Sequence, residues 1–143
     1  MKKVKKAPQK DYDNFRQYFA FSCVDLVIFD GKSILLTKRT RNPYKGYWHL
    51  PGSMIHKDES MINAAKRSAK EELGVDIKIE KFLGVYESLD KFRHDLSHGF
   101  VVSIKKSKII TDFQSDDYGF FKTLPKKTIP HHRLMIKDAL KTL

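Results

Sequence analysis

The sequence has little of several features that mark specialised protein classes. Its one cysteine, Cys23, has no partner for an internal disulfide, which excludes a disulfide-stapled secreted fold. The longest apolar stretch, residues 20–29, is interrupted by Ser22 and Asp25 and is shorter than the ~20 residues that a membrane span needs. No apolar segment follows the basic N-terminus, so no secretory signal is expected. A cytoplasmic protein with a buried, inert Cys23 is the simplest interpretation.

Acidic residues are also few. The chain has 17 of them against 28 lysines and arginines, which gives a net charge of +11. A basic surface can attract RNA or steer small phosphorylated substrates toward a site. The lysines are scattered, however, and no RNA-binding motif accompanies them. A solvated, lysine-rich surface is therefore favoured, and nucleic-acid binding is the less favoured alternative.

The length of 143 residues fits one domain over residues 1–143, long enough to bury a core. Residues 1–13 are basic and polar, which predicts a loose lead-in or a first short strand. Strands are predicted over residues 18–29, 33–38, 75–89 (one or two strands), 98–106 and 118–121, with a hairpin turn at Asp30-Gly31. Helices are predicted up to residue 73 and over residues 131–143. This order predicts an α/β (α+β) fold with a mixed β-sheet between helices.

The first predicted helix carries clear signals at both ends. Asp58 or Ser60 is suited to cap its start, and Gly74 is suited to end it at Leu73. The residues expected to face the core recur every fourth position, at Met61, Ala65, Ala69 and Leu73. In the C-terminal helix, Leu134, Ile136 and Leu140 have helical spacing.

The end of the first helix also carries the acidic groups that indicate chemistry. Glu71 and Glu72 are adjacent, and Ser68 lies one turn before Glu72 on the same face. Arg67 is spaced to reach either Glu59 or Glu71. Clustered carboxylates at a helix end bind Mg²⁺ or Mn²⁺, because these hard cations prefer oxygen ligands. Taken alone, the same residues also describe a solvated, salt-bridged helix face.

The spacing of these residues resembles the Nudix box, G-x5-E-x7-R-E-U-x-E-E-x-G-U, where U is aliphatic. Aligned on Gly74, the resemblance places Glu59 and Arg67 as a structural pair and Glu71 and Glu72 as the acid pair. Two positions depart from the pattern. Ser53 stands in place of the first glycine, although Gly52 precedes it. Ser68 replaces a glutamate that belongs to the acid cluster in most members, so weaker metal binding is expected.

The chain is most similar to the GDP-mannose mannosyl hydrolase branch of that family, which lacks the same glutamate. The similar segments are Lys38–Pro43, Gly46–Trp48, Leu50–Gly52, Lys57–Glu59 and Gln114–Tyr118. The resemblance implies that Glu72, Gln114 and the backbone oxygen of Ser53 hold Mg²⁺ or Mn²⁺. Members of that branch are dimers, so the resemblance also favours a homodimer.

The same resemblance assigns residues to the substrate. Asp25 and Arg39 are implied to contact the nucleotide diphosphate, where the planar guanidinium of Arg39 suits phosphate oxygens. Arg93 and His94 are expected to contact the substrate from a loop. Ser115 stands where the branch has a histidine base, and serine cannot take that role near neutral pH.

Two functions remain open from the sequence. The leading hypothesis is a Mg²⁺-dependent hydrolase of a nucleoside diphosphate-linked compound such as GDP-mannose, with Glu71, Glu72 and Arg39 as catalytic groups. Water would attack either the sugar carbon or a phosphorus. The alternative is a weakly active or inactive domain that binds a nucleotide or nucleotide sugar as a sensor or regulator, and the two serines Ser68 and Ser115 favour it.

Overall fold

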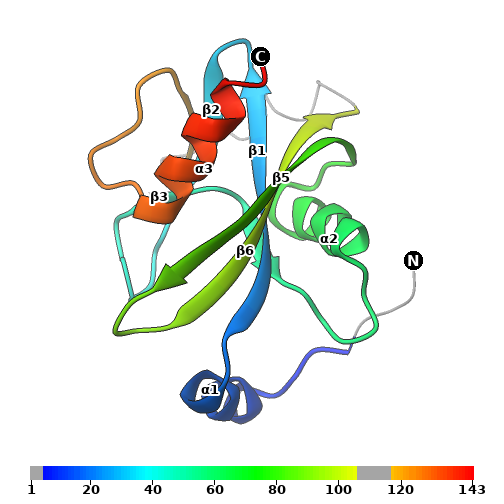
Figure 1. Cartoon of the computed structure of the whole chain (residues 1–143), viewed down its shortest axis with the longest axis vertical. Helices are drawn as coiled ribbons and strands as arrows, with labels where there is room; N and C mark the ends of the chain where they lie inside the picture. The colour runs from blue at the N-terminus through cyan, green and yellow to red at the C-terminus, as the bar shows by residue number, and fades with distance from the viewer. Residues whose placement is uncertain (1–4, 106–116) are drawn as a thin grey trace.

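The computed structural model describes residues 5–105 and 117–143, and within them a mixed β-sheet lies between two helices (Figure 1). The sheet order is β3-β2-β1-β6-β5, with β4 paired to β1 and β7 paired to β2. The strands are β1 (Phe21–Asp30), β2 (Ser33–Lys38), β3 (Trp48–His49), β4 (Gly52–Met54), β5 (Ile77–Leu89), β6 (His94–Ile104) and β7 (Tyr118–Phe121). The helices are α1 (Gln9–Tyr18), α2 (Met61–Leu73) and α3 (Pro130–Leu140). The predicted α+β fold is confirmed.

Strand β1 is central because it pairs on both sides. It runs parallel to β6 along eight residues, from the pair Phe21 and Asp95 to the pair Ile28 and Val102. It turns into β2 through the predicted hairpin, where Gly31 adopts a positive φ of 59° that glycine tolerates without steric cost. Its other neighbour is β4, which places Asp25 directly opposite Gly52.

Helix α2 forms because its ends and one of its faces are well specified. The Ser60 hydroxyl accepts a hydrogen bond from the Asn63 backbone N–H, and Gly74 ends the helix with a φ of 66°. Ala65, Ala69 and Leu73 are buried against the sheet, as predicted. Met61 is 41% exposed, so its prediction as a core residue was wrong. It lies in the first helical turn, and the burial begins only at Ala64.

Helix α3 packs with a second core cluster. Met135, Ile136 and Ala139 are buried with Leu36 and Leu50. Strand β6 approaches this helix closely, since a Cβ added at Gly99 would lie 2.8 Å from the Met135 sulfur. Leu134 and Leu140 are exposed rather than buried. The buried stripe follows positions 132, 135, 136 and 139, so the expected apolar face is correct only at Ile136.

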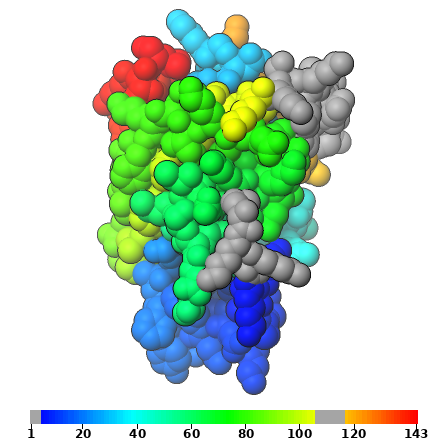
Figure 2. Space-filling model, turned by 90° about the vertical axis from the view of Figure 1, so that its right-hand side faces the viewer, coloured from blue at the N-terminus to red at the C-terminus, as the bar shows by residue number. Residues whose placement is uncertain are grey.

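Several boundaries differ from the sequence expectations, and Tyr18, expected at the start of a strand, is the last residue of α1, with β1 beginning at Phe21. The lead-in predicted for residues 1–13 as irregular or a short strand contains the start of α1. No residue of α1 is buried, and its contact with the sheet includes the Phe15 ring, which stacks 5.3 Å from Phe21. In Figure 2 this helix (blue) forms one end of the molecule. Strand β6 begins at His94, four residues before the expected position at His98.

Among the helices of the described chain, none has the length and apolar character that crossing a membrane requires.

Candidate functional site

A cavity of about 240 Å³ opens between the sheet and the start of α3. Its walls come from β1, the loop before β3, the β3–β4 segment, the β5–β6 hairpin and the first residues of α3. Four residues predicted to form the site line it, namely Asp25, Arg39, Ser53 and Arg93. The fold therefore brings together side chains that lie up to 68 positions apart in the sequence.

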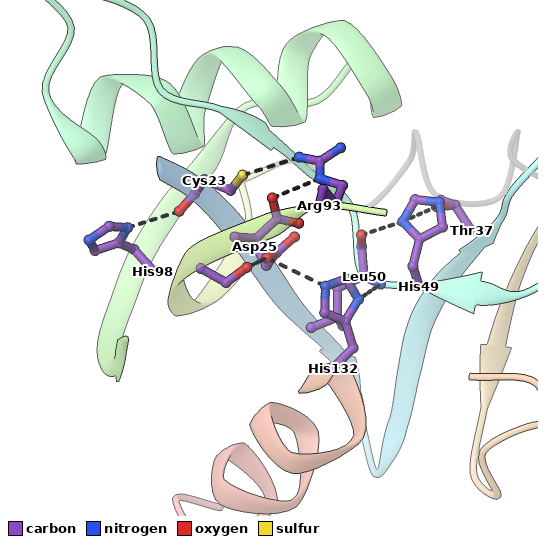
Figure 3. A network of polar contacts seen from close by, with 10 residues as sticks. Cys23, Asp25, Thr37, His49, Leu50, Arg93, His98 and His132 are labelled. Atoms are coloured by element: carbon purple, nitrogen blue, oxygen red, sulfur yellow. Dashed lines mark hydrogen bonds and ion pairs between the residues drawn. The ribbon is translucent and has the colours of Figure 1, made fainter. Parts of the chain in front are cut away.

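Asp25 is the buried acid of this cavity, with 6% of the residue exposed. Its Oδ2 atom accepts a 2.5 Å hydrogen bond from the Ser97 hydroxyl and lies 3.4 Å from His132 Nε2 (Figure 3). Burial by itself raises the pKa of Asp25. The neighbouring His132 and Ser97 outweigh burial, so the pKa of Asp25 lies below its ordinary value and the group is a carboxylate at neutral pH.

Three histidines surround this acid. His132 is 5% exposed, and its Nδ1 atom accepts the Leu50 backbone N–H at 3.0 Å. His49 contacts the Leu50 carbonyl through Nδ1 at 2.7 Å, and because a carbonyl only accepts, Nδ1 carries the proton. Burial lowers the pKa of His49 to about 4, and burial together with His132 lowers that of His131 to about 4. Both rings are therefore neutral near pH 7.

Two guanidinium groups share the same cavity. Arg39 Nε donates to the Pro43 carbonyl at 2.8 Å, and within residues 5–105 and 117–143 its terminal nitrogens have no hydrogen-bond or ion-pair partner. Burial and the charge of Arg93 lower the pKa of Arg39, which still leaves an arginine protonated. Arg93 is held by Asp95 at 2.7 Å and lies over the Phe21 ring at 4.7 Å.

The thiol of Cys23 also lines the cavity. It is buried, as expected, and burial with the charges of Asp95 and Asp25 raises its pKa to about 12. The thiol is therefore protonated and unreactive at neutral pH.

The predicted structural pair forms beside the cavity. Arg67 donates from Nε to Glu59 Oε2 at 2.6 Å and from Nη2 to Glu59 Oε1 at 2.9 Å, which is a bidentate ion pair. Arg67 Nη2 also donates to the Met54 carbonyl at 2.7 Å, and the Glu59 carboxylate accepts the His56 N–H at 3.1 Å. These bonds fix the loop after β4 against helix α2.

The two glutamates of the acid pair, Glu71 and Glu72, lie in different environments. Glu71 is partly exposed, lies 3.3 Å from Arg67 Nη1 and lies 3.7 Å from Lys6. Glu72 accepts the backbone N–H of Gly52, and its pKa is raised to about 8 by burial, with further contributions from the negative charges of Asp25 and Glu71. A buried carboxylate with a raised pKa lacks a compensating positive charge, so a bound cation would stabilise its charged form.

Two buried hydroxyls strengthen this interpretation. Ser53 Oγ and Ser68 Oγ have no hydrogen-bond partner in the described part of the chain, and Ser68 is fully buried. Buried polar atoms are almost always paired, so these two unpaired hydroxyls are suited to contact a bound ion or its water. The donor set, all oxygen, suits Mg²⁺ or Mn²⁺. Gln114, the third predicted ligand, and Ser115 lie outside the described residues.

Among the described residues, three that the sequence predicted for the site do not line the cavity, namely Glu71, Glu72 and His94, and other residues do. His94 does not line the cavity, and its Nε2 atom lies 2.8 Å from Glu87 Oε2 on the exposed surface. The cavity is also lined by Ser97, Asp95, His49, His131 and His132, which were not among the predicted site residues. A weak sequence signal for the last two was the pair His131-His132 at the start of a predicted helix. Asp25, His131 and His132 bring three potential ligand atoms within 4.8 Å of one another.

Comparison with known proteins identifies the class to which this fold and acid box belong. A family model described as the NUDIX domain matches residues 20–137, which is most of the chain. The protein therefore belongs to the Nudix hydrolase family.

Two curated relatives extend this result. The chain is 32% identical over 138 residues to an ADP-ribose pyrophosphatase of Methanocaldococcus jannaschii, covering 93% of this chain and 81% of that protein. It is 35% identical over 107 residues to the low-salt glycan biosynthesis protein Agl8 of Haloferax volcanii, covering 68% of each chain.

Solved structures agree on the fold. A MutT Nudix hydrolase from Burkholderia pseudomallei superposes with a TM-score of 0.70 at 24% identity, covering 83% of this chain and 97% of that one. A UDP-X diphosphatase superposes with a TM-score of 0.68 at 17% identity, covering 96% and 73%. At these identities the likeness supports the fold alone.

Proposed function

We propose that this protein hydrolyses nucleoside diphosphate-linked compounds with the help of a divalent metal ion. The observation that carries the proposal is the presence of two guanidinium groups, Arg39 and Arg93, in one cavity next to the acid box. Arg93 is already paired with Asp95, but its charge still lowers the pKa of Arg39, and a diphosphate supplies two adjacent negative groups that would compensate both guanidinium groups. The unpartnered terminal nitrogens of Arg39 are available for that contact.

The oxygen groups around Glu72 are suited to a Mg²⁺ or Mn²⁺ ion. Glu72 and the backbone oxygen of Ser53 would hold it, with Gln114 as the third ligand that the family resemblance implies. The ion would act as a Lewis acid that polarises a phosphoryl oxygen. Arg39 and Arg93 would bind and orient the diphosphate, and Arg39 would stabilise charge on the leaving group. Glu71, which keeps partial exposure, would assist as a weak base or through a bound water.

Nucleotide sugars and related diphosphates are the substrate class that we propose. The relative at 32% identity is named as an ADP-ribose pyrophosphatase, which supports ADP-ribose as one member of the class. The sequence resemblance to the mannosyl hydrolase branch and the relationship to a glycan biosynthesis protein support GDP-mannose as another. Attack at phosphorus would release two monophosphates, whereas attack at the sugar carbon would release a free sugar and a nucleoside diphosphate.

The test is a turnover screen of the purified protein with Mg²⁺ and with Mn²⁺. The panel would contain ADP-ribose, GDP-mannose, GDP-glucose, UDP-sugars, diadenosine polyphosphates and nucleoside triphosphates, with products separated by chromatography. We expect a nucleotide sugar or ADP-ribose to be cleaved. The absence of turnover for every diphosphate in the panel would contradict the proposal.

A substitution at Glu72 tests the assignment of the metal ligands. Glu72→Gln keeps the side-chain shape but removes the charge, so we expect divalent-ion-dependent activity to fall by at least about 100-fold. Glu80→Gln is the matched control, because Glu80 is exposed and hydrogen-bonded to Ser103, away from the cavity. Full activity in Glu72→Gln would show that another group holds the ion.

The second candidate function is nucleotide binding without efficient turnover. Ser68 favours it, because α2 carries a neutral, buried hydroxyl where most of the family has a carboxylate. Calorimetry distinguishes the two functions. Binding of ADP-ribose or GDP-mannose with no product in the turnover screen would support the sensor or regulator, and turnover would exclude it.

A further inference from the structure

The position of the proton on His132 follows from its surroundings. Its Nδ1 atom faces the backbone N–H of Leu50 at 3.0 Å, and a peptide N–H can only donate. Nδ1 must therefore offer its lone pair to Leu50. A neutral imidazole has one proton, so that proton lies on Nε2, the atom that is 3.4 Å from Asp25 Oδ2. His132 is thus fixed as a donor toward Asp25.

This tautomer argues against a metal site at the cluster of Asp25, His131 and His132. The three residues have the spacing of a metal centre. Imidazole coordinates a metal through a nitrogen lone pair, however, and both nitrogens of His132 are already committed, one to Leu50 and one to its own proton. The cluster lacks the third ligand that a protein site for Zn²⁺ requires.

Within the described part of the chain, one oxygen of the Asp25 carboxylate, Oδ1, accepts no hydrogen bond. Oδ2 receives the Ser97 hydroxyl at 2.5 Å and faces His132 Nε2, which together use the two acceptor positions of that atom. Oδ1 lies against Gly52, where an added Cβ would overlap it. Since Asp25 lines the cavity, Oδ1 is the atom that remains for a ligand, and as a carboxylate oxygen it can only accept.

We propose that His132 is a positioning residue that holds Asp25 as an anionic acceptor for a hydroxyl or N–H donor of the substrate. The inference rests on the proposed function for the existence of a substrate in this cavity, and it deepens that function in one respect. Beside the diphosphate, the substrate must present a hydrogen-bond donor to Asp25, such as a sugar hydroxyl, which inorganic pyrophosphate lacks. A buried acceptor left unpaired by a ligand that lacks the donor costs affinity.

The amide of glutamine supplies a sharp test of this role. In a carboxamide the oxygen acceptor and the N–H donor are attached to the same carbon, just as Nδ1 and Nε2 of imidazole are attached to Cε1. His132→Gln can therefore accept from Leu50 and donate to Asp25, but it does not transfer protons or bind Zn²⁺ as histidine does. His132→Phe keeps a ring of similar size and removes both bonds. His98→Gln is the control, because His98 contacts the Cys23 carbonyl and does not line the cavity.

We expect His132→Phe to raise KM for ADP-ribose or GDP-mannose by about 10- to 100-fold while kcat changes much less, because the lost interaction belongs to substrate binding. His132→Gln should recover most of that loss, and His98→Gln should match the parent protein. A normal KM in His132→Phe would overturn the proposal. Failure of His132→Gln to recover function, in a folded variant, would show that His132 transfers a proton or binds a metal.

Nuclear magnetic resonance tests the same inference without turnover. Long-range ¹H–¹⁵N spectra of the intact protein, with His132 assigned by its disappearance in His132→Gln, should show a neutral ring with its proton on Nε2. Adding Zn²⁺ should leave that pattern unchanged. A proton on Nδ1, or loss of the Nε2 proton on adding Zn²⁺, would overturn the inference even if the protein hydrolyses the panel. If the ring shows the expected tautomer but the protein turns over no substrate, the proposed function alone would be wrong.

Discussion

The ion pair between Glu59 and Arg67 gives the sharpest stability prediction. Their side chains are only 4% and 9% exposed, and two hydrogen bonds of 2.6 and 2.9 Å join them. Glu59→Gln leaves the arginine charge buried without its partner. Removing one member of a buried pair costs about 3–5 kcal/mol. The new amide oxygen still accepts one bond, and Glu71 remains 3.3 Å away, so we expect a loss near the lower end, about 3 kcal/mol.

Urea and thermal unfolding measure this loss. For a domain of this size, a loss of about 3 kcal/mol corresponds to a fall in Tm of about 8–12 °C. The matched control is Asp58→Asn, which changes carboxylate to amide in the exposed pair of Lys57 and Asp58, and it should cost less than about 1 kcal/mol. Equal losses in the two variants would refute the argument that burial makes the Glu59 pair important.

The same pair predicts how the effect depends on pH. Burial raises the pKa of Glu59, but its bonds with Arg67 and with the His56 N–H lower it more, so the folded-state pKa lies below the ordinary value. Such a group contributes stability above its unfolded pKa of about 4.3 and loses that contribution as the pH falls through the folded value. The difference between the parent protein and Glu59→Gln should therefore be constant near pH 7 and shrink below about pH 4. A difference that grows in acid would show that the sign is wrong.

Two further variants test the cavity and the acid box. Ser68→Glu adds a carboxylate one turn before Glu72 at a buried position, so it should lower Tm in the absence of metal. In differential scanning calorimetry, Mg²⁺ should then raise the Tm of this variant more than it raises the Tm of the parent protein. An unchanged response to Mg²⁺ would mean that this helix face does not reach the ion. Arg39→Lys keeps the charge but loses the planar fork, so KM for the diphosphate substrate should rise by about 10-fold or more in steady-state kinetics, and an unchanged KM would remove Arg39 from the binding site.

The parts of the fold that the sequence predicted are those with local signals. Ser60 and Gly74 lie within one turn of the helix ends that they specify, and Gly31 sits in the turn that it allows. Helix α1 was missed because it has no buried stripe, so no apolar period distinguishes it from a polar tail. The register of α3 was missed because Leu134 and Leu140 are as apolar as the residues that are buried. Which face packs is decided by the sheet and by Gly99, not by the helix itself.

In the site, too, contacts within one local motif were predictable and contacts between distant segments were not. The Glu59 and Arg67 pair was predictable, because eight residues separate the partners and both belong to one motif. The Asp25 network was not, since Ser97 lies 72 positions from Asp25 and His132 lies 82 positions from Leu50. Parallel pairing of β1 with β6 and the return of α3 over the sheet bring these side chains together. No pattern within one segment carries that information.

Gly52 connects the two halves of the site. The sequence drew attention to Ser53, which occupies the glycine position of the family motif, yet the structure places the steric requirement one residue earlier. A side chain at Gly52 would overlap both the Asp25 carboxylate and the Val24 carbonyl, while its backbone N–H donates to Glu72. Asp25, which we propose to face the substrate, and Glu72, which we propose to hold the metal, are therefore positioned against the same residue. The hydroxyl of Ser53 itself is buried and has no hydrogen-bond partner among the described residues, so it suits a bound ion or its water better than an apolar core.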